Sequence, residues 1–285
     1  MTTSEKNTAI YQCALKYLHS LLPVGITMAA LEKYYIGERG DFVALTDIYE
    51  QFIQSAQNYQ GMPNFIKYSE RREKIRKILF DFDITQIADY SVEELYQTFR
   101  KAFNVTSKDS NFSAWHKWTR SVVDAAKFLC NFNGVDDFRT FVGQFDYNLP
   151  TRTALPLLIS NKISGIGFSL ACDSLKELGF INYAKPDTHL IDICEGLMLS
   201  DKDPVSVFEA IVRMSDDCKS VDQTATPYKI DKILWLISSG RFYLDNITIG
   251  RHKNEFILLA KNNLSEKIDM RQTGICDSGL YPKEG

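Results

Sequence analysis

One short segment of the chain joins a glycine-containing turn to a helix start that can hold an anion. Residues 162–179 read Lys-Ile-Ser-Gly-Ile-Gly-Phe-Ser-Leu-Ala-Cys-Asp-Ser-Leu-Lys-Glu-Leu-Gly, so Gly165 and Gly167 separate two helical stretches. Glycines one residue apart permit positive φ and place no Cβ in the way of an approaching backbone. The free amide groups that open the second helix then form a small anion site, for which a DNA phosphate is a natural ligand. The alternative is a turn between two helices with no binding role.

The residues that follow carry a carboxylate at the start of another helix. Residues 185–193 read Lys-Pro-Asp-Thr-His-Leu-Ile-Asp-Ile, and Asp187 lies between Pro186 and a helix predicted to begin at Thr188. An N-cap aspartate accepts hydrogen bonds from otherwise unpaired amides, and these amides and the helix dipole are expected to keep it ionised. Such a fixed carboxylate can stabilise positive charge in a substrate. The simpler interpretation is that Asp187 only caps the helix.

Helix signals surround these residues, whereas strand signals are rare. Ser91 and Glu94 form a capping box, and Ser113 precedes a helical stripe of apolar side chains that Asn133-Gly134 closes. The members of this stripe are Trp115, Trp118, Val122, Ala126 and Leu129. Their spacing is that of one face of an α-helix.

Other helices can be placed in the same way, and together they predict an all-α fold. Asp203-Pro204 and Thr226-Pro227 each put a capping residue before a proline at the first helical position. Gly240 is expected to end the helix that begins after Thr226. Earlier helices are expected over residues 5–22, 28–36, 47–59 and 70–80. The run Phe242-Tyr243-Leu244 can be extended, but nothing builds a larger sheet.

The tryptophans and one histidine are candidates for a binding pocket, but their positions favour packing. Trp115 and Trp118 fit the core stripe, and Trp235 lies beside the apolar stripe of the 227–239 helix. All three are therefore expected in the core. His189 follows Asp187 in the first turn of a helix, where a local hydrogen bond is the favoured role.

The composition is that of an ordinary globular protein. Of the 285 residues 45% are hydrophobic and 24% charged, and a loose rule of about 150 residues per domain predicts one large or two interlocked domains. The N-terminus lacks the pattern of a signal peptide, and no apolar run reaches the roughly 18 residues of a membrane helix. Six cysteines without close spacing indicate reduced thiols rather than a disulfide framework or a zinc site: Cys13, Cys130, Cys172, Cys194, Cys218 and Cys276. We expect a soluble, intracellular protein.

The charge balance is unusual for a protein that binds nucleic acid. The net charge is −3 and the pI about 5.9, whereas neutralisation of phosphates is usually the main source of affinity for DNA. A DNA-binding protein of this composition must concentrate its basic charge on one surface. One basic cluster is present, and a solvated helix face is its favoured interpretation: Lys67, Arg71, Arg72, Lys74, Arg76 and Lys77.

The hairpin and the aspartate segment together resemble the helix-hairpin-helix DNA glycosylase superfamily, which includes endonuclease III and the adenine glycosylases. The hairpin of that superfamily reads hydrophobic-Pro-Gly-hydrophobic-Gly, and residues 163–167 match it with Ser164 in place of the proline. Bifunctional members carry a lysine where this chain has Ser169. The catalytic aspartate lies in a Val-Asp-Thr-His type sequence, which Asp187 matches in Pro-Asp-Thr-His, 18 positions after Ser169 as in endonuclease III. The detailed match covers residues 162–193.

Two further departures from the family pattern leave a divergent or degenerate member open. Asp192 occupies a position that is often basic in endonuclease III-like enzymes. The four-cysteine iron–sulfur loop is absent, because Cys194 and Cys218 are too few and too far apart. Neither departure removes the aspartate.

The resemblance implies an all-α, two-lobed helical bundle with a helix-hairpin-helix motif and an active-site cleft between the lobes. Residues 1–110 are then an N-terminal helical region that packs with the C-terminal helices. Residues 111–245 are the helix-hairpin-helix core, and residues 246–285 are a C-terminal helix with a frayed tail.

The resemblance also implies a monofunctional DNA N-glycosylase that acts in base excision. Such an enzyme flips a damaged, mispaired or modified base out of duplex DNA and hydrolyses its glycosidic bond. Asp187 is the implied catalytic residue, which stabilises an oxocarbenium-like transition state. Ser169 cannot form the imine that a lyase needs, so the reaction is expected to stop at the abasic site. Lys162 and Lys176 are poor replacements, because one precedes the hairpin and the other is almost two helical turns beyond it.

Double-stranded DNA is the implied partner, and the hairpin is the implied contact. The residues expected to bind DNA are Gly165, Ile166, Gly167 and Ser169. The carbonyls of Ile163 and Ile166 can hold a monovalent cation, as in family hairpins. No other metal, no cofactor and no membrane contact are expected. We expect a monomer in the cytoplasm or another intracellular compartment with access to DNA.

Three questions stay open at this point. A non-catalytic helix-hairpin-helix DNA-binding protein derived from a glycosylase is the main alternative, which the acidic net charge and Asp192 favour. An all-α interaction protein with a merely structural hairpin is another. Lys185, two residues before Asp187, is an amine whose reach is unknown, so it is a candidate for lyase activity. The pattern does not identify the excised base.

Overall fold

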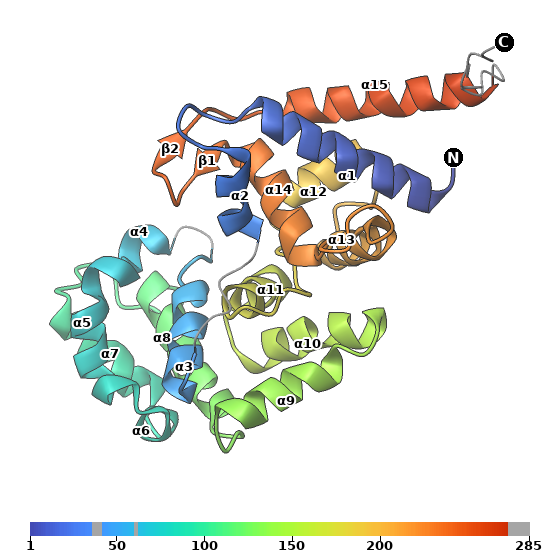
Figure 1. Ribbon diagram of the computed structural model, residues 1–285. Helices are drawn as coiled ribbons and strands as arrows, with labels where there is room; N and C mark the ends of the chain where they lie inside the picture. The colour runs from blue at the N-terminus through green and yellow to red at the C-terminus, as the bar shows by residue number, and fades with distance from the viewer. Residues whose placement is uncertain (36–41, 60–61, 273–285) are drawn as a thin grey trace, which may run out of the picture.

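The computed structural model describes residues 1–35, 42–59 and 62–272, and these are mostly α-helical (Figure 1). The expected all-α class is confirmed. The elements of the first part of the chain are α1 Thr3–Ser20, α2 Met28–Tyr35, α3 Leu45–Ala56, α4 Pro63–Ile66, α5 Tyr68–Ile78, the 3₁₀ turn η1 Phe80–Phe82, α6 Ile84–Ala88 and α7 Val92–Ala102.

The remaining helices are longer on average and include the hairpin and the aspartate segment. They are α8 Ala114–Leu129, α9 Val135–Phe145, α10 Leu149–Lys162, α11 Phe168–Glu177, α12 Thr188–Gly196, α13 Pro204–Cys218, α14 Pro227–Ser239 and α15 Lys253–Gln272. Two short strands, β1 Arg241–Phe242 and β2 Ile247–Thr248, pair antiparallel between α14 and α15. Of the run Phe242-Tyr243-Leu244, only Phe242 is in a strand.

Several helix caps are formed by the residues that the sequence indicates, but Asn133-Gly134 does not close α8, which ends at Leu129, and Gly134 is instead the N-cap of α9. The side chain of Ser113 accepts a hydrogen bond from the His116 amide, and that of Thr226 accepts one from the Lys229 amide. Gly240 ends α14 with φ +64°, where a Cβ would collide with the carbonyl of Gly250. These residues fix where the chain enters and leaves its helices.

Helix boundaries differ from the expected ones by a few residues, for local reasons. α1 begins at Thr3 because Thr2 caps it, accepting a hydrogen bond from the Glu5 amide. The helix expected over residues 70–80 ends at Ile78, since Phe80 and the two residues after it have positive φ. Residue 36, expected to end another helix, lies outside the described residues.

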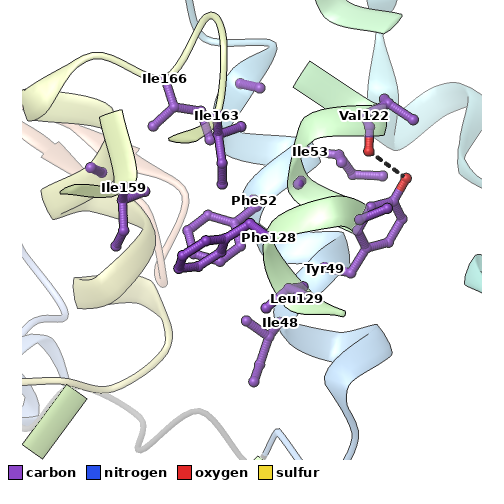
Figure 2. Packing of buried hydrophobic residues seen from close by; sticks show 14 of the residues in the cluster. Ile48, Tyr49, Phe52, Ile53, Val122, Phe128, Leu129, Ile159, Ile163 and Ile166 are labelled. Atoms are coloured by element: carbon purple, nitrogen blue, oxygen red, sulfur yellow. Dashed lines mark hydrogen bonds between the residues drawn. The ribbon is translucent and has the colours of Figure 1, made fainter. Parts of the chain in front are cut away.

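The buried apolar side chains form two clusters. The first cluster takes its members from residues 42–183, together with Phe208 and Val212 of α13. Figure 2 shows part of it, where α3 packs against α8 and the hydroxyl of Tyr49 donates a hydrogen bond to the carbonyl of Val122. Trp115 and Trp118 are buried in this cluster, which confirms their expected packing role.

The second cluster brings the two ends of the described chain together. Its members come from residues 10–34 and from residues 184–260. Helix α1 packs against α13, α14 and α15, and Figure 1 shows it lying along α15. The expected N-terminal region, residues 1–110, is therefore divided between the clusters. The chain passes from the first cluster to the second between Tyr183 and Ala184, just before the aspartate segment.

Candidate functional site

The hairpin between α10 and α11 is a tight turn that is anchored to α8. Gly165 has φ +79°, and a Cβ on it would lie 2.6 Å from the Ser121 hydroxyl. The amide of Ser164 donates to a carboxylate oxygen of Asp124 at 3.0 Å, and the Ser121 hydroxyl donates to the Ser164 carbonyl. Glycine is required at position 165 both by its dihedral angle and by this close approach.

The start of α11 leaves its first amides available. Gly167 is the N-cap residue, is exposed, and supplies no side chain to the first turn, and no described side chain caps it. Ile166, one of the residues expected to bind DNA, is buried. The carbonyl of Ile163, expected as a cation ligand, accepts a hydrogen bond from the Ile166 amide at 3.2 Å. One lone pair of that oxygen is thus occupied, and the cation site stays a prediction.

Ser169 links the hairpin to the aspartate segment. Its hydroxyl donates a hydrogen bond to the carbonyl of Pro186 at 2.8 Å. The first turn of α11 therefore lies directly against the residue that precedes Asp187. The structure brings together the two segments that carry the resemblance.

Asp187 caps α12, as its position in the sequence predicts. One carboxylate oxygen accepts hydrogen bonds from the amides of His189, at 2.9 Å, and Leu190, at 3.2 Å. The ring of His189 makes a 2.6 Å hydrogen bond with the Ser238 hydroxyl of α14. The expectation of a local hydrogen bond is therefore corrected, because the partner lies 49 positions later in the chain. The second oxygen of Asp187 has no described amide partner and belongs to a carboxylate that lines a cavity.

The electrostatic setting of Asp187 differs from the expected one. Burial raises the pKa of this carboxyl above its ordinary value, and the nearby Asp231 raises it further. The Leu190 amide, His189 and Lys185 lower the pKa, but they do not compensate. The expectation considered only the amides and the helix dipole. It missed the burial and the second carboxylate, neither of which is visible in the local sequence.

The cavity beside Asp187 has a volume of about 340 Å³ and lies between the two clusters. Helices α3 and α11 contribute one side, and the segment from Lys185 to Asp187 and α14 contribute the other. Its lining side chains are nearly all polar or aromatic: Gln51, Gln54, Ser55, Asn58, Asp173, Lys176, Glu177, Lys185, Asp187, Lys232, Trp235 and Tyr243. Each cluster supplies helices to it, so the cavity depends on their packing together.

Two ion pairs involve lysines that line this cavity. Lys176 lies 3.0 Å from Asp231, and Lys185 lies 2.9 Å from Asp173. The same Asp231 oxygen accepts a hydrogen bond from the Lys185 amide at 2.8 Å, which fixes the backbone two residues before Asp187. Burial lowers the pKa of Lys176, but Asp231, Asp173 and Glu177 outweigh it and raise the pKa above the ordinary value. Lys176 is therefore a protonated group.

Two expectations about the neighbourhood of Asp187 are corrected. Lys176 was placed too far along α11 to be relevant, yet it lines the same cavity. Trp235 is not a core residue: it is half-buried, lines the cavity and packs edge-on against the rings of His189 and Tyr243. Helix α14 turns its Ile stripe inward and presents Trp235 and Lys232 on a different face.

Sequence reasoning missed most of the cavity because its members are far apart in the chain. The glutamines of α3 that line the cavity precede Asp187 in the sequence by more than a hundred positions. Lys232 and Tyr243 follow it by about fifty. One signal was available. Lys232 and Trp235 are three residues apart, so they share a face of their helix outside the apolar stripe.

The basic cluster at α5 is paired in part with neighbouring carboxylates. Arg72 pairs with Glu50 and Glu73, and Arg76 pairs with Asp81. The guanidinium of Arg71 lies over the ring of Trp115. Arg71, Lys74 and Lys77 form no ion pair among the described residues, so the cluster keeps part of its positive charge.

Asp192 is also paired. Its carboxylate forms an ion pair with Lys253 at the start of α15. A side chain at a position that is often basic in endonuclease III-like enzymes therefore adds less negative charge than its identity indicates.

A larger cavity, of about 590 Å³, lies between α8, α9 and α10. Asp124, Lys127 and Lys162 line it together with phenylalanines. It does not include Asp187. We place the candidate site at the smaller cavity, because a perturbed carboxyl group, an aromatic wall and the hairpin meet there.

Neither a metal cluster nor a membrane helix is found within residues 1–35, 42–59 and 62–272. No group of three or more His, Cys, Asp or Glu side chains in these ranges is arranged to hold a metal ion. No helix there combines the length and apolar character that crossing a membrane requires. The cysteines within the described ranges are free thiols, and Cys276 lies outside them.

Comparison with protein-family models, curated protein sequences and solved structures finds no match for this chain.

Proposed function

We propose that the protein is a monofunctional DNA N-glycosylase with a two-lobed, helix-hairpin-helix arrangement. One observation carries the proposal: Asp187 lines a cavity between two cores, and the Ser169–Pro186 hydrogen bond ties it to a hairpin with an open helix start. The two clusters correspond to the two lobes. The hairpin amides bind a DNA phosphate, and the cavity receives the flipped base.

The proposed reaction is hydrolysis of the bond between the sugar and the base. As the C1′–N bond breaks, positive charge builds on the sugar, and the carboxylate of Asp187 stabilises it. A water molecule then adds its hydroxyl to C1′. Its remaining proton balances the charge of the departing base. Asp187 must be ionised to act, so the rate is expected to rise with pH through the raised pKa of this carboxyl.

The ion pairs in the cavity support a reaction without a lyase step. A lysine attacks C1′ only as a free amine. Lys176 and Lys185 both line the cavity, but each is held by a carboxylate as an ammonium group. Ser169 uses its hydroxyl to bind the Pro186 carbonyl. The proposed enzyme therefore leaves an intact strand with an abasic site.

The test uses duplexes that each carry one altered base, drawn from oxidised, alkylated, deaminated, mispaired and bulky modified types. The protein is incubated with each duplex and the strand is then cleaved with hot alkali. We expect alkali-dependent cleavage at one or a few base types, and none with the Asp187→Asn variant. Absence of release from every type would contradict the proposal.

A second candidate is a non-catalytic DNA-binding protein with the same hairpin. Two observations favour it: the net charge is −3, and part of the α5 basic cluster is paired internally. Both weaken the binding of phosphates, on which a glycosylase that searches along DNA depends more than a protein that binds DNA only occasionally. It predicts salt-sensitive binding of duplex DNA with no base release. Asp187 weighs against it, since a purely structural cap needs no cavity in front of its carboxylate.

A further inference from the structure

Lys232 brings a cation with spare hydrogen-bond donors into the Asp187 cavity. The residue is only 7% exposed. Its ammonium group donates to the Tyr243 hydroxyl at 3.1 Å and lies 5.0 Å from the centre of that ring. The nearest carboxylate oxygen, on Glu177, is 3.6 Å away, which is beyond hydrogen-bond distance. One hydrogen bond from three donors leaves capacity for a ligand.

Lys232 is charged at neutral pH. Burial is the largest influence on its pKa and lowers it, as does the neighbouring Lys176. Glu177 and the rings of Tyr228 and Tyr243 outweigh both, so the pKa lies above the ordinary value for lysine. The side chain is therefore a donor only, never an acceptor.

The other two lysines of the cavity are already occupied. Lys176 is held by Asp231 and Lys185 by Asp173, each at hydrogen-bond distance. Lys232 is thus the cavity lysine without a carboxylate at that distance among the described residues. A ligand that enters the cavity meets its ammonium group.

The walls suit a flat heterocycle with a polar edge. Trp235 and Tyr243 contribute aromatic side chains on the α14 side. Gln51 and Gln54 of α3, and Asn58 just after it, line the other side with carboxamides, which can both donate and accept. The volume of about 340 Å³ is at the lower end of ligand pockets, which is the size range of a single base.

On the basis of the glycosylase activity proposed above, we propose that this cavity selects bases that present a keto oxygen to Lys232. Uracil and hypoxanthine are such bases, and each arises when the amino group of cytosine or adenine is replaced by oxygen. An ammonium group donates a hydrogen bond to a keto oxygen. It forms none with an amino group at the same position, because both groups are donors. A cationic alkylated base is repelled by the ammonium group, which also already occupies the face of Tyr243.

The test compares duplexes that contain uracil, hypoxanthine or 1-methyladenine, a cationic alkylated base that has no keto oxygen. Release is measured after alkali for the unaltered protein and for Lys232→Met and Lys232→Arg. We expect faster release of uracil or hypoxanthine than of 1-methyladenine. We expect Lys232→Met to lower that release by at least about tenfold, the factor for one lost hydrogen bond to a charged donor. Lys232→Arg should restore part of it, because arginine keeps the donors.

Lys229→Met is the matched control. Lys229 is on the same helix, one turn earlier, but pairs with Asp222 at 2.7 Å outside the cavity. It should leave the preference between bases unchanged, and thermal melting reports whether each variant is folded. The ranking of bases by the unaltered protein needs no variant, so it tests the proposal even if Lys232→Met does not fold.

The outcomes separate this inference from the proposed function. Faster release of 1-methyladenine than of either keto base would overturn the inference and leave the glycosylase standing. Release of keto bases that a folded Lys232→Met variant retains in full would overturn it as well. Release of no base of any type would remove the proposed function and this inference together.

Discussion

Replacing Asp187 by asparagine changes the charge of the proposed catalytic group and very little else. The asparagine side chain keeps an oxygen for the amides of His189 and Leu190, which Asp187 accepts at 2.9 and 3.2 Å. Asparagine and aspartate are about equally good N-cap residues, so α12 should keep its start. The variant therefore separates a structural cap from a catalytic carboxylate.

The expected loss of rate can be estimated from electrostatics. A carboxylate about 4 Å from the charged sugar, at an effective dielectric constant near 20, stabilises it by about 4 kcal/mol. A loss of that size lowers the rate of base release about a thousandfold. DNA affinity should be unchanged or slightly higher, because a negative charge is removed and no phosphate contact is lost.

The same variant should gain stability at neutral pH. The pKa of Asp187 is raised by folding, so ionising this carboxyl costs the folded state free energy. The unaltered protein then loses stability as the pH rises from the unfolded pKa, about 3.9, through the folded one. Asparagine avoids that loss. The difference in melting temperature should favour Asp187→Asn at neutral pH and disappear below about pH 4, where aspartate is protonated in both states.

Single-turnover base release, DNA-binding titrations and thermal melting across pH measure these effects. Asp203→Asn is the matched control, since Asp203 caps α13 through the Ser206 amide but is exposed and outside the cavity. It should keep full activity and show no such stabilisation. Base release by Asp187→Asn at the rate of the unaltered protein would refute the catalytic assignment.

Three further predictions follow from the same region. Gly165→Ala should destabilise the protein by more than about 1 kcal/mol in denaturant unfolding, because of its positive φ and the nearby hydroxyl, whereas Gly167→Ala, which meets nothing within 4 Å, should be nearly neutral. Asp231→Asn should destabilise the protein by less than the about 3–5 kcal/mol of a fully unpaired buried charge, because Lys176 loses its closest carboxylate but keeps Asp173 and Glu177 at 3.7 and 3.9 Å. It should also shift the rise of activity to lower pH, and a pH profile that does not shift would contradict the effect of Asp231 on Asp187. Borohydride should trap no covalent complex with DNA, and trapping that Lys185→Gln removes would identify that amine as the nucleophile.

The helices were largely predictable because their signals are local. A capping side chain, a proline at the first helical position and a C-terminal glycine all act within a turn, as at Thr226 and Gly240. The division of the core was not predictable in this way. Residues 42–59 and α1 are close in sequence but belong to different clusters, and only packing against helices far along the chain decides this.

In the candidate site, too, the local features were predictable from the sequence and the long-range contacts were not. Asp187 and the hairpin were found because cap, glycine turn and spacing lie within one short stretch. The raised pKa of Asp187 was missed because burial and then Asp231, more than forty positions later, cause it, and the role of Lys176 was missed because that lysine pairs with the same Asp231. Trp235 was assigned to the core because it lies next to an apolar stripe. The stripe predicts which side of the helix is buried, but it does not predict what packs against the residues beside it.

The charges around the cavity argue that the reactive form of Asp187 is the ionised one. Four carboxyl groups and three ammonium groups line the cavity or pair with a side chain that lines it: Asp173, Glu177, Asp187, Asp231, Lys176, Lys185 and Lys232. With Asp187 protonated the set is neutral, and with Asp187 ionised it carries one excess negative charge. Burial and Asp231 make that excess costly in the empty site, which is why the pKa is raised. A sugar that becomes cationic as its bond to the base breaks removes the cost, so the charge is stabilised most in the transition state, where it accelerates the reaction.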